Sequence, residues 1–226
     1  CSSDLYTMES LKNQNNLSSN IKASFFNISQ ALDCGICNNK WEQFLEELKQ
    51  LKPKLVLDAE AAYKNDPAAK SIKEVYLAYP GFYAITMYRI SNILWKLEIP
   101  ILPRMISEYT HGVTGTDIHP GATIGDSFFI DHATGVVIGE TTIIKDNVTI
   151  YQGVTLGGIK VDKVLRDTKR HPTINNNVTI YANATILGGE VIIGENSVIG
   201  ANVWITKTIP KNSIVTYKSE IKITNK

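Results

Sequence analysis

The feature that most constrains the fold is an aliphatic residue that returns at every sixth position between Asp117 and Leu156. These positions hold Ile118, Ile124 and Ile130 and, after a slip of two residues, Ile138, Ile144, Ile150 and Leu156. A small or apolar residue usually stands two positions earlier, as at Ala122 and Val136. A period of six fits neither an α-helix nor a simple alternating strand. It is typical of a parallel β-helix, in which three short strands form one triangular coil.

The same period returns further along the chain. It is carried by Ile174, Ile180 and Ile186 and, after a slip of one residue, by Ile193, Ile199 and Ile205. The two runs together are enough for roughly four stacked coils. Between Leu156 and Ile174 the period fails and the sequence is charged and irregular. A loop of this length inside a regular solenoid is usually functional.

Residues 9 to about 112 show helical spacing instead. One apolar stripe comprises Ile21, Phe25, Ile28 and Leu32. A second stripe begins at Trp41 and reaches Leu51, and we expect Pro53 to disturb or end that helix. The spacing predicts a separate short helix over residues 55–63.

Proline signals divide the remainder of this part. Asp66 suits the N-cap and Pro67 the first position of a new helix. The break Tyr79-Pro80-Gly81 precedes another helix, and a last short helix follows Pro103. These amphipathic helices must bury their apolar stripes. We expect them to cap the first coil, whose end cannot close itself, and also to self-associate.

The predicted fold class is therefore α+β, with an all-α domain followed by a parallel β-helix of hexapeptide repeats. The helical domain covers residues 1–112, and Met8 is a candidate natural start, with the first eight or so residues outside the folded part. The β-helix covers residues 113–209 and contains the loop 157–173. Residues 210–226 read as a polar tail.

Composition excludes several classes of function. The formal net charge is +1, so there is no strong field to attract nucleic acid or an anionic membrane. No run approaches the ~18 apolar residues that a membrane span needs, and the first residues show no apolar signal segment. We expect a cytoplasmic protein with neither nucleic-acid nor membrane partners.

The chain has three cysteines, which cannot make a disulfide framework. Cys34-Gly-Ile-Cys37 is a lone C-x-x-C motif, which suits either a redox pair or half of a zinc site. Because no second pair or nearby histidine accompanies it, we interpret Cys34 and Cys37 as ordinary thiols and predict no metal.

Histidines are scarce, and three of the four lie in or beside the repeats, in Asp117-Ile118-His119, Asp131-His132 and Arg170-His171. Because a coil takes roughly eighteen residues, Asp117 and His132 can approach one corner on adjacent coils. A carboxylate beside an imidazole fixes its tautomer and suits it to act as a general base near neutral pH. The alternative is a purely structural Asp–His pair.

These motifs carry a family resemblance. D-P-A at Asp66, D-I-H-P at Asp117, D-H-A-T-G-V-V-I-G-E at Asp131, V-T-L-G-G at Val154 and R-H-P at Arg170 occur in the order found in serine O-acetyltransferases. The likeness runs from about residue 58 to residue 208, and the D-H-A-T-G run is highly specific. The chain thus resembles this family of hexapeptide-repeat acyltransferases.

The resemblance implies acetyl transfer from acetyl-CoA to the hydroxyl of L-serine, which yields O-acetylserine in cysteine biosynthesis. It also implies a left-handed β-helix that forms a homotrimer or a dimer of trimers, with active sites between neighbouring subunits. Feedback inhibition by cysteine is common in the family and would use the serine pocket.

The resemblance also assigns roles to residues. His132 would be the general base, and Asp117 would orient it. The serine-binding residues would be Asp66, Asp131, Arg170 and His171, with Glu140 close to them. Gly158 and Ala182 would lie near the thioester and pantetheine of acetyl-CoA, the co-substrate, and the pair Gly157-Gly158 would let the backbone approach the CoA arm closely. The residue chemistry agrees, because a zwitterionic amino acid needs opposite charges a few Å apart and arginine suits a carboxylate.

Plainer interpretations stand beside these. Asp66 is a good N-cap, Asp131 suits a solvated turn, and Arg170 with His171 lies in a basic stretch that suits a solvated loop or the phosphates of CoA. We interpret His119 as structural and leave His111 unassigned.

Other functions for the same fold are an acetyltransferase for a sugar or another hydroxyl compound, a zinc hydro-lyase of the γ-carbonic-anhydrase type, and a scaffold without activity. Zinc would need three converging imidazoles, and a scaffold would need only the periodic aliphatic residues.

Two features depart from the family pattern. The loop over residues 159–169 is longer than the compact glycine-rich version, which leaves its contacts with CoA open. Relatives that dock into O-acetylserine sulfhydrylase do so with a tail ending in isoleucine, whereas this chain ends Ile-Thr-Asn-Lys226. We therefore do not predict that complex.

Overall fold

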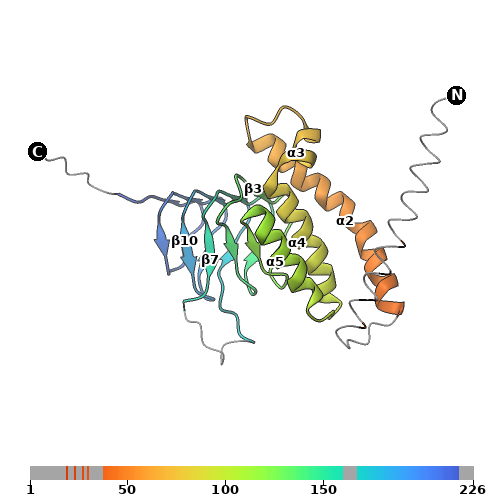
Figure 1. The fold of residues 1–226 in the computed structure, drawn as a ribbon. Coiled ribbons are helices and arrows are strands. Elements are labelled where there is room, and N and C mark those ends of the chain that lie inside the picture. Colours follow the sequence, from red (N-terminus) through yellow and green to blue (C-terminus); the bar gives the residue numbers. More distant parts are fainter. Residues whose placement is uncertain are drawn as a thin grey trace, which may run out of the picture.

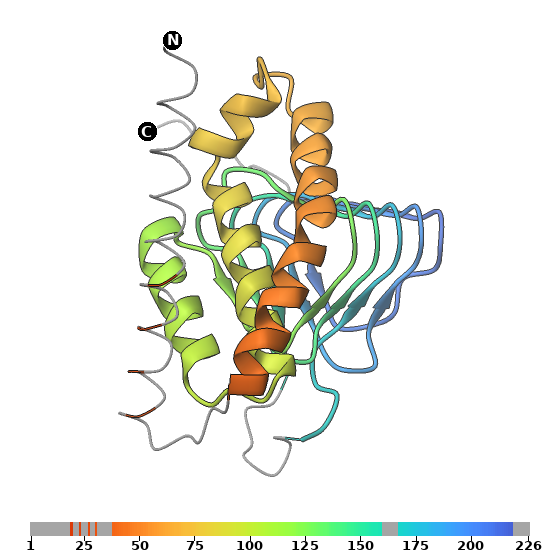
Figure 2. The same cartoon turned by 90° about the vertical axis from the view of Figure 1, so that its right-hand side faces the viewer.

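The fold is known from a computed structural model, which describes residues 38–159 and 167–218 and four isolated helical positions before them. Helices come first in the chain and a stack of triangular coils follows (Figure 1). Seen from the helical end, the helices lie in front of the coils (Figure 2), so they cover one end of the stack. The residues of the predicted apolar stripe, Ile21, Phe25, Ile28 and Leu32, and the pair Cys34 and Cys37 lie outside the described residues.

The first described helix, α2 (Asn38–Asn65), continues without a break past Pro53. The prediction that Pro53 divides this segment into two helices was wrong. Proline removes one backbone N–H and crowds the carbonyl four residues earlier. However, Leu51 before the proline and Ala59 after it are both buried, so burial on both sides of residue 53 favours one continuous helix.

A further expectation about this region was also wrong. Asp66 and Pro67 form a turn, and the next helix, α3 (Ile72–Ala78), begins later with Ser71 as its N-cap. The Ser71 hydroxyl accepts a hydrogen bond from the backbone N–H of Glu74 at 3.2 Å. Ser71 therefore satisfies a free N–H of the first turn, which is the role that had been assigned to Asp66.

The predicted break before Gly81 is confirmed. Tyr79 is extended, with φ −85° and ψ 114°, and α4 (Pro80–Lys96) begins directly after it. Helix α5 (Leu102–Thr114) follows, with Pro103 in its first turn and Gly115 as a left-handed C-cap. Within the described residues, none of these helices is long and apolar enough to cross a membrane.

Three parallel sheets form the sides of a left-handed β-helix. The first sheet holds β1 (Asp117–Ile118), β4 (Val137–Ile138), β7 (Thr155–Gly157), β10 (Thr185–Leu187) and β13 (Trp204–Ile205). The second holds β2 (Thr123–Ile124), β5 (Ile143–Ile144), β8 (Thr173–Ile174) and β11 (Ile192–Ile193). The third holds β3 (Phe129–Ile130), β6 (Thr149–Ile150), β9 (Thr179–Ile180), β12 (Val198–Ile199) and β14 (Ile214–Val215).

The six-residue period fills the axis of the coils. All thirteen of its aliphatic residues are buried, and the most exposed of them, Ile124, has 7% of its surface accessible. The small or apolar residues two positions earlier, such as Ala122, Val136 and Val154, are fully buried as well. Each coil is thus held by apolar burial against the coils above and below it.

The spacing between coils shows where the regular repeat is interrupted. Asp117 pairs with Val137, twenty residues later, whereas Val137 pairs with Thr155, eighteen residues later. The two additional residues lie in the corner 131–136, which contains the D-H-A-T-G motif. A second interruption separates Ile143 from its partner Thr173 by thirty residues. Both interruptions fall on predicted site residues.

The helices cap the first coil, as predicted. Strand β1 and its neighbours have no preceding coil, so polar backbone groups at this edge need other partners. Ser107 of α5 donates to the carbonyl of Ile118 at 2.8 Å, and Tyr88 of α4 donates to that of Ala122 at 2.6 Å. Asn92 donates to the same Ala122 carbonyl at 3.1 Å. The helical side chains thus replace the missing coil.

A buried ion pair joins α2, α4 and this coil. Nε and Nη2 of Arg89 lie 2.6 and 2.8 Å from the two carboxylate oxygens of Asp58. The Asp58 carboxylate also accepts from the backbone N–H of Phe128 at 3.0 Å, while Arg89 Nη2 donates to the carbonyl of Gly125 at 2.7 Å. Each charged group is therefore compensated by hydrogen bonds, as buried charges require.

The last coil extends further than the predicted boundary at residue 209. Strand β14 pairs with β12 in the third sheet, and Ile209 forms a single bridge to Ile193. We therefore propose that the β-helix reaches residue 215 and that the tail begins after it.

Candidate active site

Two edges of the triangular stack hold the residues that the sequence singles out. The Asp131 edge joins the third sheet to the first and comprises residues 131–136, 151–154 and 181–184. The Arg170 edge joins the first sheet to the second, and its described residues are 119–122, 139–142, 158–159, 167–172 and 188–191. Asp131 and His132 lie on one of these edges, and Arg170 and His171 lie on the other.

His132 is presented outward on the Asp131 edge. Its side chain is 69% exposed, and its Nδ1 atom lies 3.8 Å from Oδ1 of Asp131. His132 and Ala133 both have positive φ, of 58° and 65°, a conformation that residues with a Cβ seldom adopt. Local backbone strain of this kind is often concentrated at functional sites.

Asp117 lies near the same edge without contacting His132. The hydroxyl of Thr116 donates to the carbonyl of Ala133 at 3.0 Å, which brings the start of β1 beside the D-H-A-T-G corner. Among the described residues, no hydrogen bond or ion pair joins Asp117 to His132. The orienting role of Asp117 stays a prediction, and Asp131 is the carboxylate at ion-pair distance from His132.

Asp66 reaches the Asp131 edge from the end of α2. Its Oδ1 atom accepts from the backbone N–H of Ala68 at 2.8 Å, and its Oδ2 atom accepts from the hydroxyl of Tyr79 at 2.5 Å. This hydrogen bond, burial and the negative charges of Asp66, Glu74 and Asp131 raise the pKa of Tyr79 to about 12. Three carboxylates, those of Asp66, Glu74 and Asp131, thus act on one phenol.

Two stacked tyrosines continue this edge along the coils. The rings of Tyr151 and Tyr181 lie 4.9 Å apart and are inclined by only 16°. Burial, followed by Tyr181 and the carboxylates of Asp131 and Asp66, raises the pKa of Tyr151. The edge therefore combines anionic groups with an aromatic wall.

The Arg170 edge contains side chains of both charges. Nη2 of Arg170 donates to Oε2 of Glu140, and both side chains are about one quarter exposed, at 24% and 27%. The backbone N–H of Arg170 donates to the hydroxyl of Thr141 at 2.9 Å. These contacts hold the end of the long loop against the neighbouring coil, with its guanidinium partly accessible.

His171 is fixed beside Arg170 in a defined tautomer. The backbone N–H of Thr141 donates to Nδ1 of His171 at 3.1 Å. Because a backbone N–H only donates, the ring proton of neutral His171 is on Nε2. Burial, followed by the positive charges of Arg170 and Lys169, lowers the pKa of His171 to about 4. Near neutral pH this imidazole is an uncharged hydrogen-bond donor.

His119 lies in the same cluster, although the sequence suggested a purely structural role. Its ring packs edge-on against Trp95 with centroids 5.1 Å apart, and its Nδ1 atom accepts from the N–H of Gly121 at 3.0 Å. Burial, followed by the charge of Arg104, lowers the pKa of His119 to about 4. His111 lies on the surface of α5, with Nδ1 3.9 Å from Glu108.

The residues assigned to acetyl-CoA are also divided between the edges. Gly157 ends β7 at the Arg170 edge, and its carbonyl accepts from the N–H of Gly188 at 3.0 Å. Gly158 follows it in the chain. Ala182 lies on the Asp131 edge, where its carbonyl accepts from the N–H of Asn202 at 3.0 Å. Residues 160–166 of the loop lie outside the described part of the chain.

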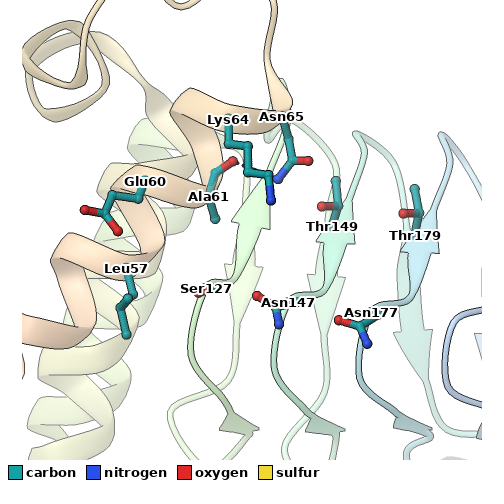
Figure 3. A pocket seen from close by; sticks show the side chains of 10 residues that line it. All are labelled: Leu57, Glu60, Ala61, Lys64, Asn65, Ser127, Asn147, Thr149, Asn177 and Thr179. Carbon is teal, nitrogen blue, oxygen red and sulfur yellow. Dashed lines mark hydrogen bonds between the residues drawn. The ribbon is translucent and has the colours of Figure 1, made fainter.

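A polar groove of about 420 Å³ lies between α2 and the third sheet, at the corner that joins the second sheet to the third (Figure 3). Lys64 and Asn65 line it from the end of α2, and Thr149 and Thr179 line it from adjacent strands. None of the predicted site residues lines this groove. Asn65, which precedes Asp66, lines the groove, but the charged residues Asp66, Asp131 and Arg170 do not.

Sequence reasoning missed the aromatic members of both edges. Tyr79 was interpreted only as part of a helix break, and its contact with Asp66 spans thirteen residues. Tyr151 and Tyr181 follow periodic isoleucines at equivalent corners, so their stacking could have been inferred from the coil register. The coil register could not indicate Trp95, because helix α4, and not a coil, brings it against His119. In the described ranges, no group of three His, Cys, Asp or Glu side chains is placed to hold a metal ion.

The stacked hexapeptide coils, the helical cap and the charged edges define a hexapeptide-repeat transferase architecture, and comparisons with known proteins narrow this class. No protein-family model matches the chain. A serine acetyltransferase encoded on a plasmid of Synechococcus elongatus is 46% identical over 180 residues, which are 77% of this chain and 56% of that protein.

Solved structures agree with this likeness. Serine acetyltransferase isoform 3 of Entamoeba histolytica, solved in complex with cysteine, matches with a TM-score of 0.82 and 36% identity over 94% of this chain and 76% of that one. The Neisseria gonorrhoeae enzyme in complex with serine matches with a TM-score of 0.71 and 35% identity over 80% and 72% of the two chains. The chain belongs to the serine acetyltransferase family. It spans about half the length of the curated relatives it matches, between 49% and 56% for the first three.

Proposed function

We propose that the protein is a serine O-acetyltransferase, which transfers the acetyl group of acetyl-CoA to the hydroxyl of L-serine in cysteine biosynthesis. Family membership supports the reaction, and one observation supports the acceptor. The two edges carry the charges that an amino-acid zwitterion requires, with Asp66 and Asp131 on one edge and Arg170 on the other. The carboxylates would face the ammonium group, and Arg170 with neutral His171 would bind the carboxylate.

In the proposed reaction, His132 accepts the proton of the serine hydroxyl as that oxygen attacks the thioester carbon. A new C–O bond forms, the C–S bond breaks, and the departing CoA sulfur takes the proton from His132. Transfer is direct, so no nucleophilic residue is acylated. The rate acceleration would come from positioning of the two substrates and from the general base, which typically contributes roughly 10²–10⁴.

The division of the residues between two edges supports a site shared by neighbouring subunits. Within one chain, the Asp131 edge and the Arg170 edge bound the same sheet from opposite sides. In a homotrimer with its axis along the stack, the Asp131 edge of one subunit would face the Arg170 edge of the next. Gly157 and Gly158 on one edge and Ala182 on the other would then bind one acetyl-CoA together.

The reaction is tested by release of the CoA thiol from acetyl-CoA with L-serine as acceptor, measured against a panel of sugars and other hydroxyl compounds. We expect L-serine to be preferred by its kcat/KM. A clear preference for a sugar would instead assign the protein to the sugar acetyltransferases.

The shared site is tested by mixing two impaired variants, one in turnover and one in serine binding, and assaying them at a serine concentration below the KM of Arg170→Ala. Each chain would carry either His132→Asn or Arg170→Ala, and the two would be expressed together so that mixed trimers form. Because some interfaces would then combine two unaltered edges, activity should exceed that of either variant alone. If each site belonged to one chain, the mixture would remain as inactive as its parts.

A further inference from the structure

Tyr79 and Ala68 hold both oxygens of the Asp66 carboxylate. The Tyr79 hydroxyl donates to Oδ2 at 2.5 Å, and the backbone N–H of Ala68 donates to Oδ1 at 2.8 Å. A hydroxyl bonded to an ionised carboxylate at this distance is a strong, charge-assisted hydrogen bond. With one donor on each oxygen, the plane of the carboxylate is fixed, and each oxygen keeps a lone pair for a further donor.

Asp66 needs such support because of where it lies. It directly follows Asn65, the last residue of α2, and its own N–H donates to the carbonyl of Ala62 at 3.0 Å. The carbonyl end of a helix carries partial negative charge, so a carboxylate there is unfavourable. The two donors offset this effect and keep the Asp66 side chain in place.

The chain fold aims Tyr79 at this position. Pro80 excludes a helical conformation at residue 79, so Tyr79 is extended between α3 and α4. Its N–H still donates to the carbonyl of Val75 at 3.3 Å, and the Val75 side chain is fully buried against α2. The phenol, which is partly buried, therefore points back toward the end of α2.

We propose that Tyr79 is a positioning residue, which orients Asp66 to receive the ammonium group of the amino-acid substrate. This inference rests on the proposed function and extends it to a residue that does not itself touch the substrate. Removing the hydroxyl leaves Asp66 in place but free to rotate, so substrate binding weakens while the chemical step is unaffected.

The test is Tyr79→Phe, with Tyr83→Phe as the matched control. Tyr83 is on α4, is 39% exposed, and its hydroxyl makes no hydrogen bond within the described residues. Tyr79→Phe should raise the KM for L-serine by about 10- to 150-fold, the range of one charge-assisted hydrogen bond. The kcat and the KM for acetyl-CoA should stay within about twofold of the original, and Tyr83→Phe should change none of these values.

A double-mutant cycle separates positioning from a merely structural role. If Tyr79 acts through Asp66, then adding Tyr79→Phe to Asp66→Ala should raise the serine KM no further. Melting temperatures of all variants show whether they fold. Three results would overturn the inference while the proposed reaction stands. They are an unchanged serine KM in Tyr79→Phe, a fall in kcat as large as the rise in the serine KM, and effects of Tyr79→Phe and Asp66→Ala on the serine KM that add fully in the double variant. An original enzyme that is inactive with L-serine would instead overturn the proposed function.

Discussion

The imidazole ring of His171 lies directly over Gly139, so that a Cβ atom on residue 139 would come within 2.2 Å of its Cδ2 and Nε2 atoms. Gly139→Ala must therefore displace the ring, and we expect a serine KM raised about tenfold and a loss of about 1–3 kcal/mol in unfolding free energy.

Gly112→Ala is the control, because a Cβ there meets nothing within 4 Å. Gly112 lies in α5, so Gly112→Ala should leave the unfolding free energy unchanged or raise it by about 0.5–1 kcal/mol. Equal behaviour of the two variants in urea unfolding and kinetics would contradict the prediction.

The Asp58–Arg89 pair should be critical for stability. Arg89→Met leaves the carboxylate of Asp58 buried without its partner, which costs about 3–5 kcal/mol of unfolding free energy. The control is Lys54→Met, since Lys54 pairs with Asp126 at the surface and should contribute at most about 1 kcal/mol. Denaturant unfolding monitored by circular dichroism measures both. A loss below about 1 kcal/mol for Arg89→Met would show that the pair does not secure the cap.

His132→Asn should reduce kcat by roughly 10²–10⁴ because the variant lacks the general base. The exposed position of His132 means that folding and oligomeric state should be unchanged. His111→Asn, which alters another exposed histidine, should keep full activity. Turnover near the original rate in His132→Asn would refute the assignment of the base.

Arg170→Ala should act mainly on serine binding. Loss of the guanidinium removes the proposed partner of the substrate carboxylate, so the serine KM should rise by about 10- to 100-fold, with a smaller effect on the KM for acetyl-CoA. Arg104→Ala removes an exposed arginine that pairs with Glu108, and it serves as the control. If the KM for acetyl-CoA rose instead, Arg170 would be reassigned to the CoA phosphates.

The pKa of His119, lowered to about 4 from its usual 6.5, predicts how stability changes with pH. Between these two values the unfolded chain binds a proton at residue 119 that the folded chain does not. The free energy of unfolding should therefore fall as the pH drops from 6.5 toward 4, and it should be independent of this group above 6.5. His119→Asn should lose less stability than the original protein between pH 7.5 and pH 5 in urea unfolding. Equal losses would show that His119 is not held neutral.

Much of the fold could be predicted from the period of six, because burial along the axis fixes which residues face inward. Ile118 and Ile205, at opposite ends of the repeat, are both buried as expected. Helix boundaries were less predictable. Pro53 and Asp66 carry strong local signals, but packing of α2 against its neighbours and the Ser71 cap decided the outcome.

The candidate site was only partly predictable. That Asp131 lies close to Tyr151 can be inferred from the sequence, because they follow Ile130 and Ile150, which pair on adjacent coils. The contact of Asp66 with Tyr79, however, depends on how two helices pack, and the six-residue period carries no information about that. The division of Arg170 and His132 between two edges likewise follows from three-dimensional topology and not from the motifs themselves.

The helical cap has a consequence for how copies of this chain can associate. Uncapped stacks of parallel coils could join end to end without limit and grow into fibres. Here Tyr88, Asn92 and Ser107 already occupy carbonyls at the first coil. Addition of a further coil to that end by strand pairing is therefore blocked.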